Sequence, residues 1–279
     1  MVFLCITIVF PFWQQIVISI SPVDEASEVS LHLYTANPTL DAYKRLFKTG
    51  TIIDAYFWTI LRTVLGTVLT VTVTTAMAYP LSKRNFTGRN FWMSLVAFTM
   101  FFGGGLIPTY LVVHRLKLLN TIWALVLPCL CSAWNIIIVR NYFQSLPEEL
   151  EESAKIDSAN DIQIFARLIL PLSKPILATI TLWTMVDHWN AWYDAMIYTS
   201  GNKIIVLQNF LRQMLDDASR MTGSDIDSLL NQMTAQGQNY NPESVRAAVL
   251  MLVTGPIICV YPFLQKYFVK GLMVGSIKG

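Results

Sequence analysis

Residues that could do chemistry gather in one otherwise apolar stretch, which runs from Trp183 to Asp194 and reads WTMVDHWNAWYD. A carboxylate beside an imidazole, as at Asp187 and His188, can relay a proton or act in acid–base catalysis. Carboxylates and amides next to aromatic rings can instead bind a sugar, by hydrogen bonds to its hydroxyls and stacking on its CH faces. Asp187 and Asp194 are seven residues apart, so a continuous helix would place both on one face. Helix–helix packing, a cavity lining and catalysis all remain open for the candidate residues, which are Asp187, His188, Trp189, Asn190, Tyr193 and Asp194, with Gly104 from an earlier glycine run.

The composition indicates a membrane protein. Of 279 residues, 54% are hydrophobic and only 14% are charged, whereas soluble domains carry about 25% charged residues. A net charge of +2 without a long basic run gives no sign of nucleic-acid binding. The chain contains no G-x-x-x-x-G-K-[ST] phosphate loop, so any ATP must be bound by another chain. The four cysteines (Cys5, Cys129, Cys131 and Cys259) all fall in apolar stretches and lack the clustered spacing of a zinc site. We expect Cys129 and Cys131 to be buried small residues without a metal.

Six apolar stretches are long enough to cross a bilayer at about 1.5 Å per residue. The first lacks the basic segment and cleavage site of a signal peptide, so we expect it to be retained. In the third, Gly103-Gly104-Gly105 followed by Pro108 predicts a broken helix beside protein or a wet cavity. We expect Arg62, near the outer end of the second stretch, to snorkel toward the membrane surface. The predicted fold class is therefore all-α and polytopic, with about six transmembrane helices at residues 1–20, 56–80, 91–113, 121–140, 176–200 and 245–264.

One long polar stretch, residues 145–175, separates two of these spans and reads SLPEELEESAKIDSANDIQIFARLILPLSKP. Ser145 and Glu148 have the spacing of a capping box, which predicts a helix start. The acidic residues that follow suit the positive end of a helix dipole. Residues 157–160 predict a bend before a second short helix, which Pro171 ends. We therefore expect a compact knob of two short helices outside the bilayer.

Particular strings within this stretch resemble the EAA loop of importer-type ABC permeases, specifically the carbohydrate group that includes the smaller maltose permease. The matching strings are Glu152-Ser153-Ala154, Ile156-Asp157-Ser158-Ala159 and the ILPLSKP run that ends at Pro175. Two positions depart from the family pattern: Ser153 replaces an alanine and Ser158 replaces the glycine of the bend. If the bend needs a positive φ, this serine costs about 1 kcal/mol. Further strings with a resemblance to the family are LDAYKRLF, GGGLIPTYLVV, HWNAWYDA and QKYFVKGLMVGSIKG.

The resemblance implies the type I ABC importer permease fold with both termini cytoplasmic, an orientation that the short basic loop at residues 82–89 also favours. It divides the chain into a first transmembrane helix (1–20), an extracytoplasmic segment (21–55) and a permease core (56–279). The core would contain a cytoplasmic coupling loop (145–175), an outer loop (201–244) and a cytoplasmic tail (265–279). The residues expected to couple to an ATPase are Glu152, Ser153, Ala154, Ile156, Asp157, Ser158 and Ala159, with Gly275, Ser276, Lys278 and Gly279 as a tail contact.

The same resemblance implies a non-enzymatic subunit in the cytoplasmic membrane of a bacterium. Its partners would be a second, homologous permease, two ATPase subunits that hold ATP and Mg²⁺, an extracytoplasmic sugar-binding protein, and membrane lipid. The expected substrate is an oligosaccharide, with uronate-bearing fragments of alginate, pectin or glycosaminoglycans as candidates. A uronate favours a buried cation, for which Arg62 and His188 are available. The alternatives are an importer of another solute, a proton-coupled secondary transporter that uses Asp187, His188 and Asp194, and a membrane enzyme.

Overall fold

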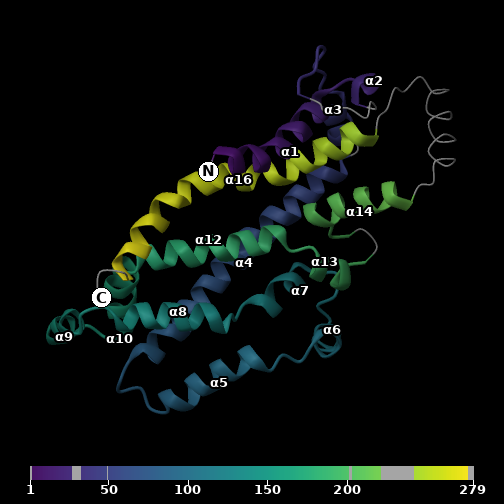
Figure 1. Ribbon diagram of the computed structural model, residues 1–279. Coiled ribbons are helices and arrows are strands. Elements are labelled where there is room, and N and C mark those ends of the chain that lie inside the picture. Colours follow the sequence, from purple (N-terminus) through teal and green to yellow (C-terminus); the bar gives the residue numbers. More distant parts are fainter. Residues whose placement is uncertain (1, 27–32, 49, 201–202, 221–241, 276–279) are drawn as a thin grey trace. The chain divides into compact units, whose positions relative to one another are not determined.

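A computed structural model describes residues 2–26, 33–48, 50–200, 203–220 and 242–275 (Figure 1). All regular secondary structure within these ranges is helical. The chain forms two compact units, the first from Met1–Thr59 with Ile204–Cys259 and the second from Ile60–Lys203 with Val260–Gly279. Two long helices, α4 (Thr51–Ser82) and α16 (Pro242–Gly275), contribute to both.

The first unit is organised around α1 (Val2–Ile20) and the adjoining part of α16. A small core joins them, formed by Ile18 of α1, Ala26 at the end of α2 and Ala247 of α16. The Tyr43 hydroxyl donates to Ser19 Oγ at 2.9 Å and so holds α3 against α1. The string LDAYKRLF (residues 40–47), whose resemblance to the family implies an amphipathic helix, is helical, because α3 covers Asp41–Lys48. Part of the stretch predicted as an outer loop is instead helix α14. The remaining helices of this unit are α2 (Val23–Ala26) and α14 (Leu207–Arg220).

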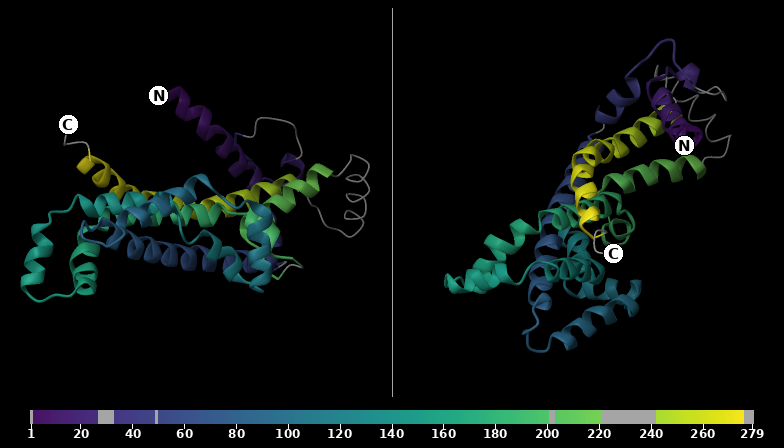
Figure 2. Two further views of the ribbon diagram at one scale, coloured as in Figure 1. Left: turned by 90° about the horizontal axis from the view of Figure 1, so that it is seen from below. Right: turned by 60° about the vertical axis from the view of Figure 1, so that its left-hand side comes forward.

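The second unit is built on α4, α8 and α12, from whose ends the short helices α9 and α10 project together in every view (Figures 1 and 2). Two of the breaks between its helices have a local cause. Gly105, at φ 81°, separates α5 from α6, and Pro128 lies in the one-turn 3₁₀ helix η1. The helices are α5 (Arg89–Phe101), α6 (Leu106–Arg115), α7 (Ile122–Val126), η1 (Leu127–Cys129), α8 (Ala133–Gln144), α9 (Glu149–Ile156), α10 (Asp161–Ile164), the π-helix η2 (Phe165–Ile169), α11 (Leu170–Leu172), α12 (Lys174–Asn190) and α13 (Tyr193–Tyr198).

By length and composition, three of the described helices could cross a membrane, or up to six segments if each bent helix pair counts as one span. The six predicted spans correspond to the larger of these two counts. The pair α5–α6 bends by 113° at the predicted glycine break, and the pair Ile122–Cys129 with α8 bends by 52°. The fifth span differs from the prediction, because α12 ends at Asn190 and does not continue to residue 200. The sixth also differs, since α16 continues past residue 264 to Gly275.

Candidate functional site

The two short helices of the knob begin differently from the prediction. Ser145 is the C-cap of α8, and its hydroxyl donates to the Tyr142 carbonyl at 2.7 Å, so the expected capping box with Glu148 is wrong. A capping box occurs instead at the second helix. The Asn160 side chain accepts from Gln163 N at 2.8 Å, and the Gln163 side chain accepts from Asn160 N at 3.0 Å. This Asn-x-x-Gln spacing was readable in the sequence and marks where α10 must start.

The bend between the two helices is a Schellman motif. Ser158 N donates to Lys155 O, and Ala159 N donates to Ala154 O, both at 3.0 Å. This pattern places Ser158 at the left-handed position that glycine usually occupies, and its φ is 62°. The bend conformation that the family resemblance implied is therefore present with a serine in it. Since a side chain disfavours this region by about 1–2 kcal/mol, the bend carries local strain.

An apolar cluster joins the knob to the ends of the longer helices. Ile164 and Ile169 from the knob are almost fully buried in it. The Phe165 ring lies 4.9 Å from the Tyr79 ring of α4, centroid to centroid. Such close-packed contacts transmit a displacement of one element to its neighbours. The cluster consists of Ala78, Tyr79, Val139, Phe143, Ile164, Ile169 and Ile180, with partly buried neighbours that include Ala154 and Ala159.

A charge pair fixes α9 from the side of the basic loop. Lys83 forms a partly buried ion pair with Glu151, and its Nζ also lies 4.4 Å from the centre of the Tyr79 ring. Arg84 Nε lies 3.3 Å from Glu148 Oε1, but both side chains are largely exposed, so this second pair contributes little. From the sequence, the carboxylates were expected only to suit the helix dipole and the basic residues only to favour an orientation in the membrane. The pairing could not be predicted because the partners are 68 positions apart.

The expected coupling residues divide between two faces of the knob. Glu152, Ser153, Ile156 and Asp157 are exposed, together with Ser158 at the bend. Ile156 is 84% exposed and Ile162, across the bend, is 78% exposed. Two large aliphatic side chains so open on a small knob form a candidate docking surface. Ala154 and Ala159 are only partly buried but pack against the apolar cluster, so they support the knob from beneath.

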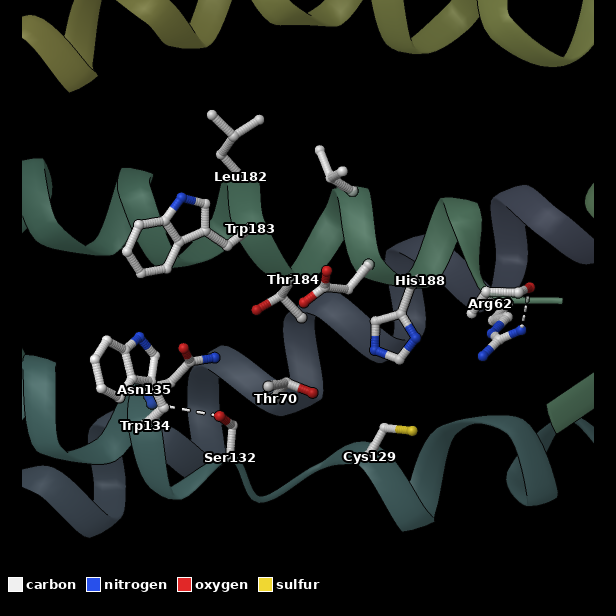
Figure 3. A pocket seen from close by; sticks show the side chains of 13 residues that line it. Arg62, Thr70, Cys129, Ser132, Trp134, Asn135, Leu182, Trp183, Thr184 and His188 are labelled. Carbon is white, nitrogen blue, oxygen red and sulfur yellow. Dashed lines mark hydrogen bonds between the residues drawn. The ribbon is translucent and has the colours of Figure 1, made fainter. Parts of the chain in front are cut away.

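The second candidate site is a cavity of about 810 Å³ inside the second unit, between α4, the η1–α8 segment and α12 (Figure 3). In Figure 3, Trp134, Asn135 and Trp183 lie at one end, Arg62 lies at the other, and Thr184, Thr70 and His188 lie between them. The size is within the range of small-molecule sites, about 300–1,000 Å³. The lining residues are Arg62, Thr70, Cys129, Ser132, Trp134, Asn135, Leu182, Trp183, Thr184, Val186, Asp187, His188 and Ala191.

Arg62 does not snorkel: its side chain is 1% exposed and points into this cavity. It forms a bidentate ion pair with Asp194, in which the Nη1–Oδ1 distance is 3.1 Å. Nη1 also donates to the Ala191 carbonyl at 3.0 Å. The prediction failed because α12 ends just before Ala191, so that a backbone carbonyl and a carboxylate become available to the guanidinium inside the protein.

The same helix end separates the two aspartates that were expected to share a face. Asp187 lies on α12, whereas Asp194 lies on α13 beyond the break at residues 191–192. His188 is buried against Gly66, where a Cβ would lie 2.5–2.7 Å from the imidazole ring. Only glycine at that position leaves room for the ring.

The structure therefore brings together only part of the predicted pathway. Asp187 and His188 line the cavity, and Asp194 reaches it through Arg62. The other candidates are not among the lining residues: Trp189 is buried elsewhere, Asn190 and Tyr193 are exposed, and Gly104 lies in the α5–α6 break. Thr70, Thr184 and Trp183 also line the cavity but were not among the predicted site residues, because without a fold their helical faces cannot be assigned to one cavity.

Three further expectations concern the cysteines, a metal site and the C-terminal tail. All four cysteines are free and exposed in this single chain, so the predicted burial of Cys129 and Cys131 is wrong, and Cys129 lines the cavity. No group of three or more His, Cys, Asp or Glu side chains in the described ranges could hold a metal ion. Of the predicted tail contact, Gly275 ends α16, and Ser276, Lys278 and Gly279 lie outside the described residues.

A helical membrane chain with a polar knob anchored on its spans, and a mixed polar and aromatic cavity among them, is the architecture of a transporter's membrane subunit. Residues 55–274 match the family described as "Binding-protein-dependent transport system inner membrane component", and the chain belongs to this family. The resemblance to ABC permeases drawn from the knob is thereby confirmed.

Relatives cover nearly the whole chain. It is 43% identical to Protein LplC of Bacillus subtilis (strain 168) over 271 residues, which are 97% of this chain and 90% of that protein. It is 41% identical over 273 residues to the polygalacturonan/rhamnogalacturonan transport system permease protein YtcP of the same organism, covering 97% of this chain and 93% of YtcP. A solved chain, from a crystal structure of a bacterial ABC transporter involved in the import of the acidic polysaccharide alginate, superposes with a TM-score of 0.87 at 32% identity, covering 95% and 92% of the two chains.

Proposed function

We propose that this chain is the permease subunit of an ATP-driven importer that translocates an oligosaccharide containing uronate residues. The observation that carries the proposal is the knob: two short helices, locked to the ends of α4, α8 and α12 by a buried cluster, present Ile156 and Ile162 outward. An exposed apolar face on a rigidly mounted element suits a partner that pushes on it.

A knob that receives a push from outside the membrane requires partner chains. Two ATPase subunits would hold ATP and Mg²⁺ and receive the knobs of this chain and of a second, homologous permease. An extracytoplasmic binding protein would deliver the sugar. ATP can shift the inward-open and outward-open states only through its different affinity for them, and about 5.5 kcal/mol converts a 1:99 population into 99:1.

The proposed orientation places the knob, both termini and the tail 265–279 in the cytoplasm of a bacterium, with residues 21–55 and 201–244 on the outer side. Of the third bent pair, which joins Asp161–Leu172 to α12 at an angle of 80°, α12 is then the membrane span and Asp161–Leu172 belongs to the knob. The boundaries 1–20, 21–55 and 56–279 remain our proposed division of the chain.

The substrate class is supported by the relatives. The name of YtcP specifies polygalacturonan and rhamnogalacturonan, and the solved transporter is described as importing alginate, an acidic polysaccharide. Both are polymers with uronic-acid units. We therefore assign uronate-containing oligosaccharides to this chain.

Charge reversal at Glu152 tests the assignment of the knob. Glu152→Lys should abolish import and release the ATPase from the complex recovered from the membrane, while the chain still inserts. Asp41→Lys is the matched control, since Asp41 is also exposed, on α3, and its ion pair with Lys44 lies on the surface. Normal import and normal ATPase recovery with Glu152→Lys would remove this residue from the interface.

Recovery of the unaltered complex tests the proposal as a whole. An ATPase should co-purify with the chain from its native membrane. If none does, and uptake follows a pH gradient without ATP, the adjacent Asp187 and His188 in the cavity would instead favour the proton-coupled alternative.

A further inference from the structure

Three buried polar atoms along the cavity have no hydrogen-bond partner within the described part of the chain. They are Arg62 Nε, Thr70 Oγ1 and Thr184 Oγ1. Their residues are 1%, 2% and 4% exposed and come from two different helices, α4 and α12. A buried polar group without a partner costs about 1–3 kcal/mol, and folded proteins rarely leave one unsatisfied. Groups of this kind that border a cavity suit a ligand that can donate and accept hydrogen bonds.

Aromatic side chains stand at one end of the same cavity. Trp183 on α12 and Trp134 on α8 both lie there, beside Asn135 (Figure 3). Indole faces offer flat apolar area, and the asparagine amide adds a donor and an acceptor. Together with the two threonine hydroxyls, this set matches a pyranose ring, which has apolar CH faces and a rim of hydroxyl groups.

The charges of the cavity argue against a carboxylate in it. Arg62, the buried cation that a uronate would favour, already holds Asp194 through two nitrogen–oxygen contacts. Asp187 is exposed on the cavity wall and has no ion-pair partner among the described residues. A ligand therefore meets an uncompensated carboxylate, and a like charge placed beside it is disfavoured.

We propose that this chain itself contacts the transported oligosaccharide here, binding a neutral sugar ring through its hydroxyls in preference to a uronate ring. The inference rests on the proposed function for the identity of the cargo. An oligosaccharide with both neutral and acidic units would place a neutral unit in this cavity, and its carboxylates would be bound elsewhere along the pathway.

Binding measurements on the full chain, in the complex recovered from its membrane and placed in lipid nanodiscs, test this. The probes are the neutral disaccharide α-1,4-digalactose and its acidic counterpart α-1,4-digalacturonate, titrated by calorimetry. Thr70→Val and Thr184→Val should each weaken digalactose binding about five- to tenfold, the effect of one lost hydrogen bond between uncharged groups. Asp187→Asn should strengthen digalacturonate binding about fivefold, as expected when one charge repulsion is removed. The affinity for digalactose should change by less than about twofold.

Thr74→Val is the matched control. Thr74 is a fully buried threonine of α4 whose hydroxyl also has no partner in the described part of the chain, but it does not line the cavity. The inference is overturned if Thr74→Val weakens digalactose binding as much as Thr70→Val does, or if the unaltered chain binds no digalactose. It is also overturned if Asp187→Asn leaves the preference between the two probes unchanged. ATPase recovery and ATP-dependent import by the same preparations report separately on the proposed function, which survives each of these three results.

Discussion

The serine at the bend of the knob permits a test in which one substitution has opposite effects at two nearby positions. Ser158 has a φ of 62° and closes the Schellman motif between α9 and α10. Replacing it with glycine removes the contact between Cβ and the backbone that disfavours this conformation. Ser158→Gly should therefore stabilise the bend.

The magnitude follows from two opposing terms. Relief of the left-handed strain is worth about 1–2 kcal/mol. Glycine gives back about 0.5–1 kcal/mol, because it loses more backbone freedom on folding. The net gain of about 0.5–1 kcal/mol corresponds to a two- to fivefold smaller constant for local opening of the bend.

Hydrogen exchange of the amides at positions 158 and 159 measures this opening directly, because both donate the hydrogen bonds that define the bend. Their exchange should slow about two- to fivefold in Ser158→Gly, as the free-energy gain requires. Ser153→Gly, inside α9, should instead speed exchange, since glycine in a helix interior lowers stability. Equal changes of the same sign in both variants would refute the strain assigned to Ser158.

Two further variant sets test the contacts that position the knob and the cavity. Lys83→Glu and Glu151→Lys should each lower import and ATPase coupling, and the double variant should recover most of the loss in both. A double variant no better than the singles would show that the pair does not position α9. Asp194→Asn should destabilise the chain by about 3–5 kcal/mol in thermal unfolding, because it leaves its buried arginine partner without a counter-charge. Joint replacement of Asp194 and Arg62 by apolar residues of similar size should restore most of the stability. If this double variant is as unstable as Asp194→Asn, the result would argue against the ion pair.

Local sequence signals predicted the local features of the fold. The triple glycine before Pro108 predicted the break between α5 and α6, and the resemblance of the string LDAYKRLF to the family predicted α3. The departure at Ser158 was recognised as a cost conditional on a positive φ, and the structure supplies that φ. In each case the physical cause lies within a few residues of its effect.

Features that depend on distant partners could not be predicted in this way. Arg62 has the pattern of a snorkelling residue until the end of α12, about 130 positions later, places Ala191 and Asp194 beside it. The Ser145 capping box failed because α8 extends far enough to use that serine as its C-cap. Both positions satisfied a local rule, and a competing partner determined the outcome.

The knob and the cavity are connected through shared helices. On α12, Ile180 belongs to the buried cluster under the knob, and Thr184, one turn further, lines the cavity. On α8, Asn135 lines the cavity and Val139, again one turn away, belongs to the cluster. On α4, Thr70 lines the cavity and Ala78 belongs to the cluster.

A turn of helix spans about 5.4 Å and does not compress appreciably, so the three helices that hold the knob also frame the cavity wall. We therefore expect a push on Ile156 or Ile162 to reach the cavity as a movement of whole helix faces, without any chain of side-chain switches between the two sites. It follows that variants which loosen the cluster, and not only those in the docking face or the cavity, should separate ATP hydrolysis from transport.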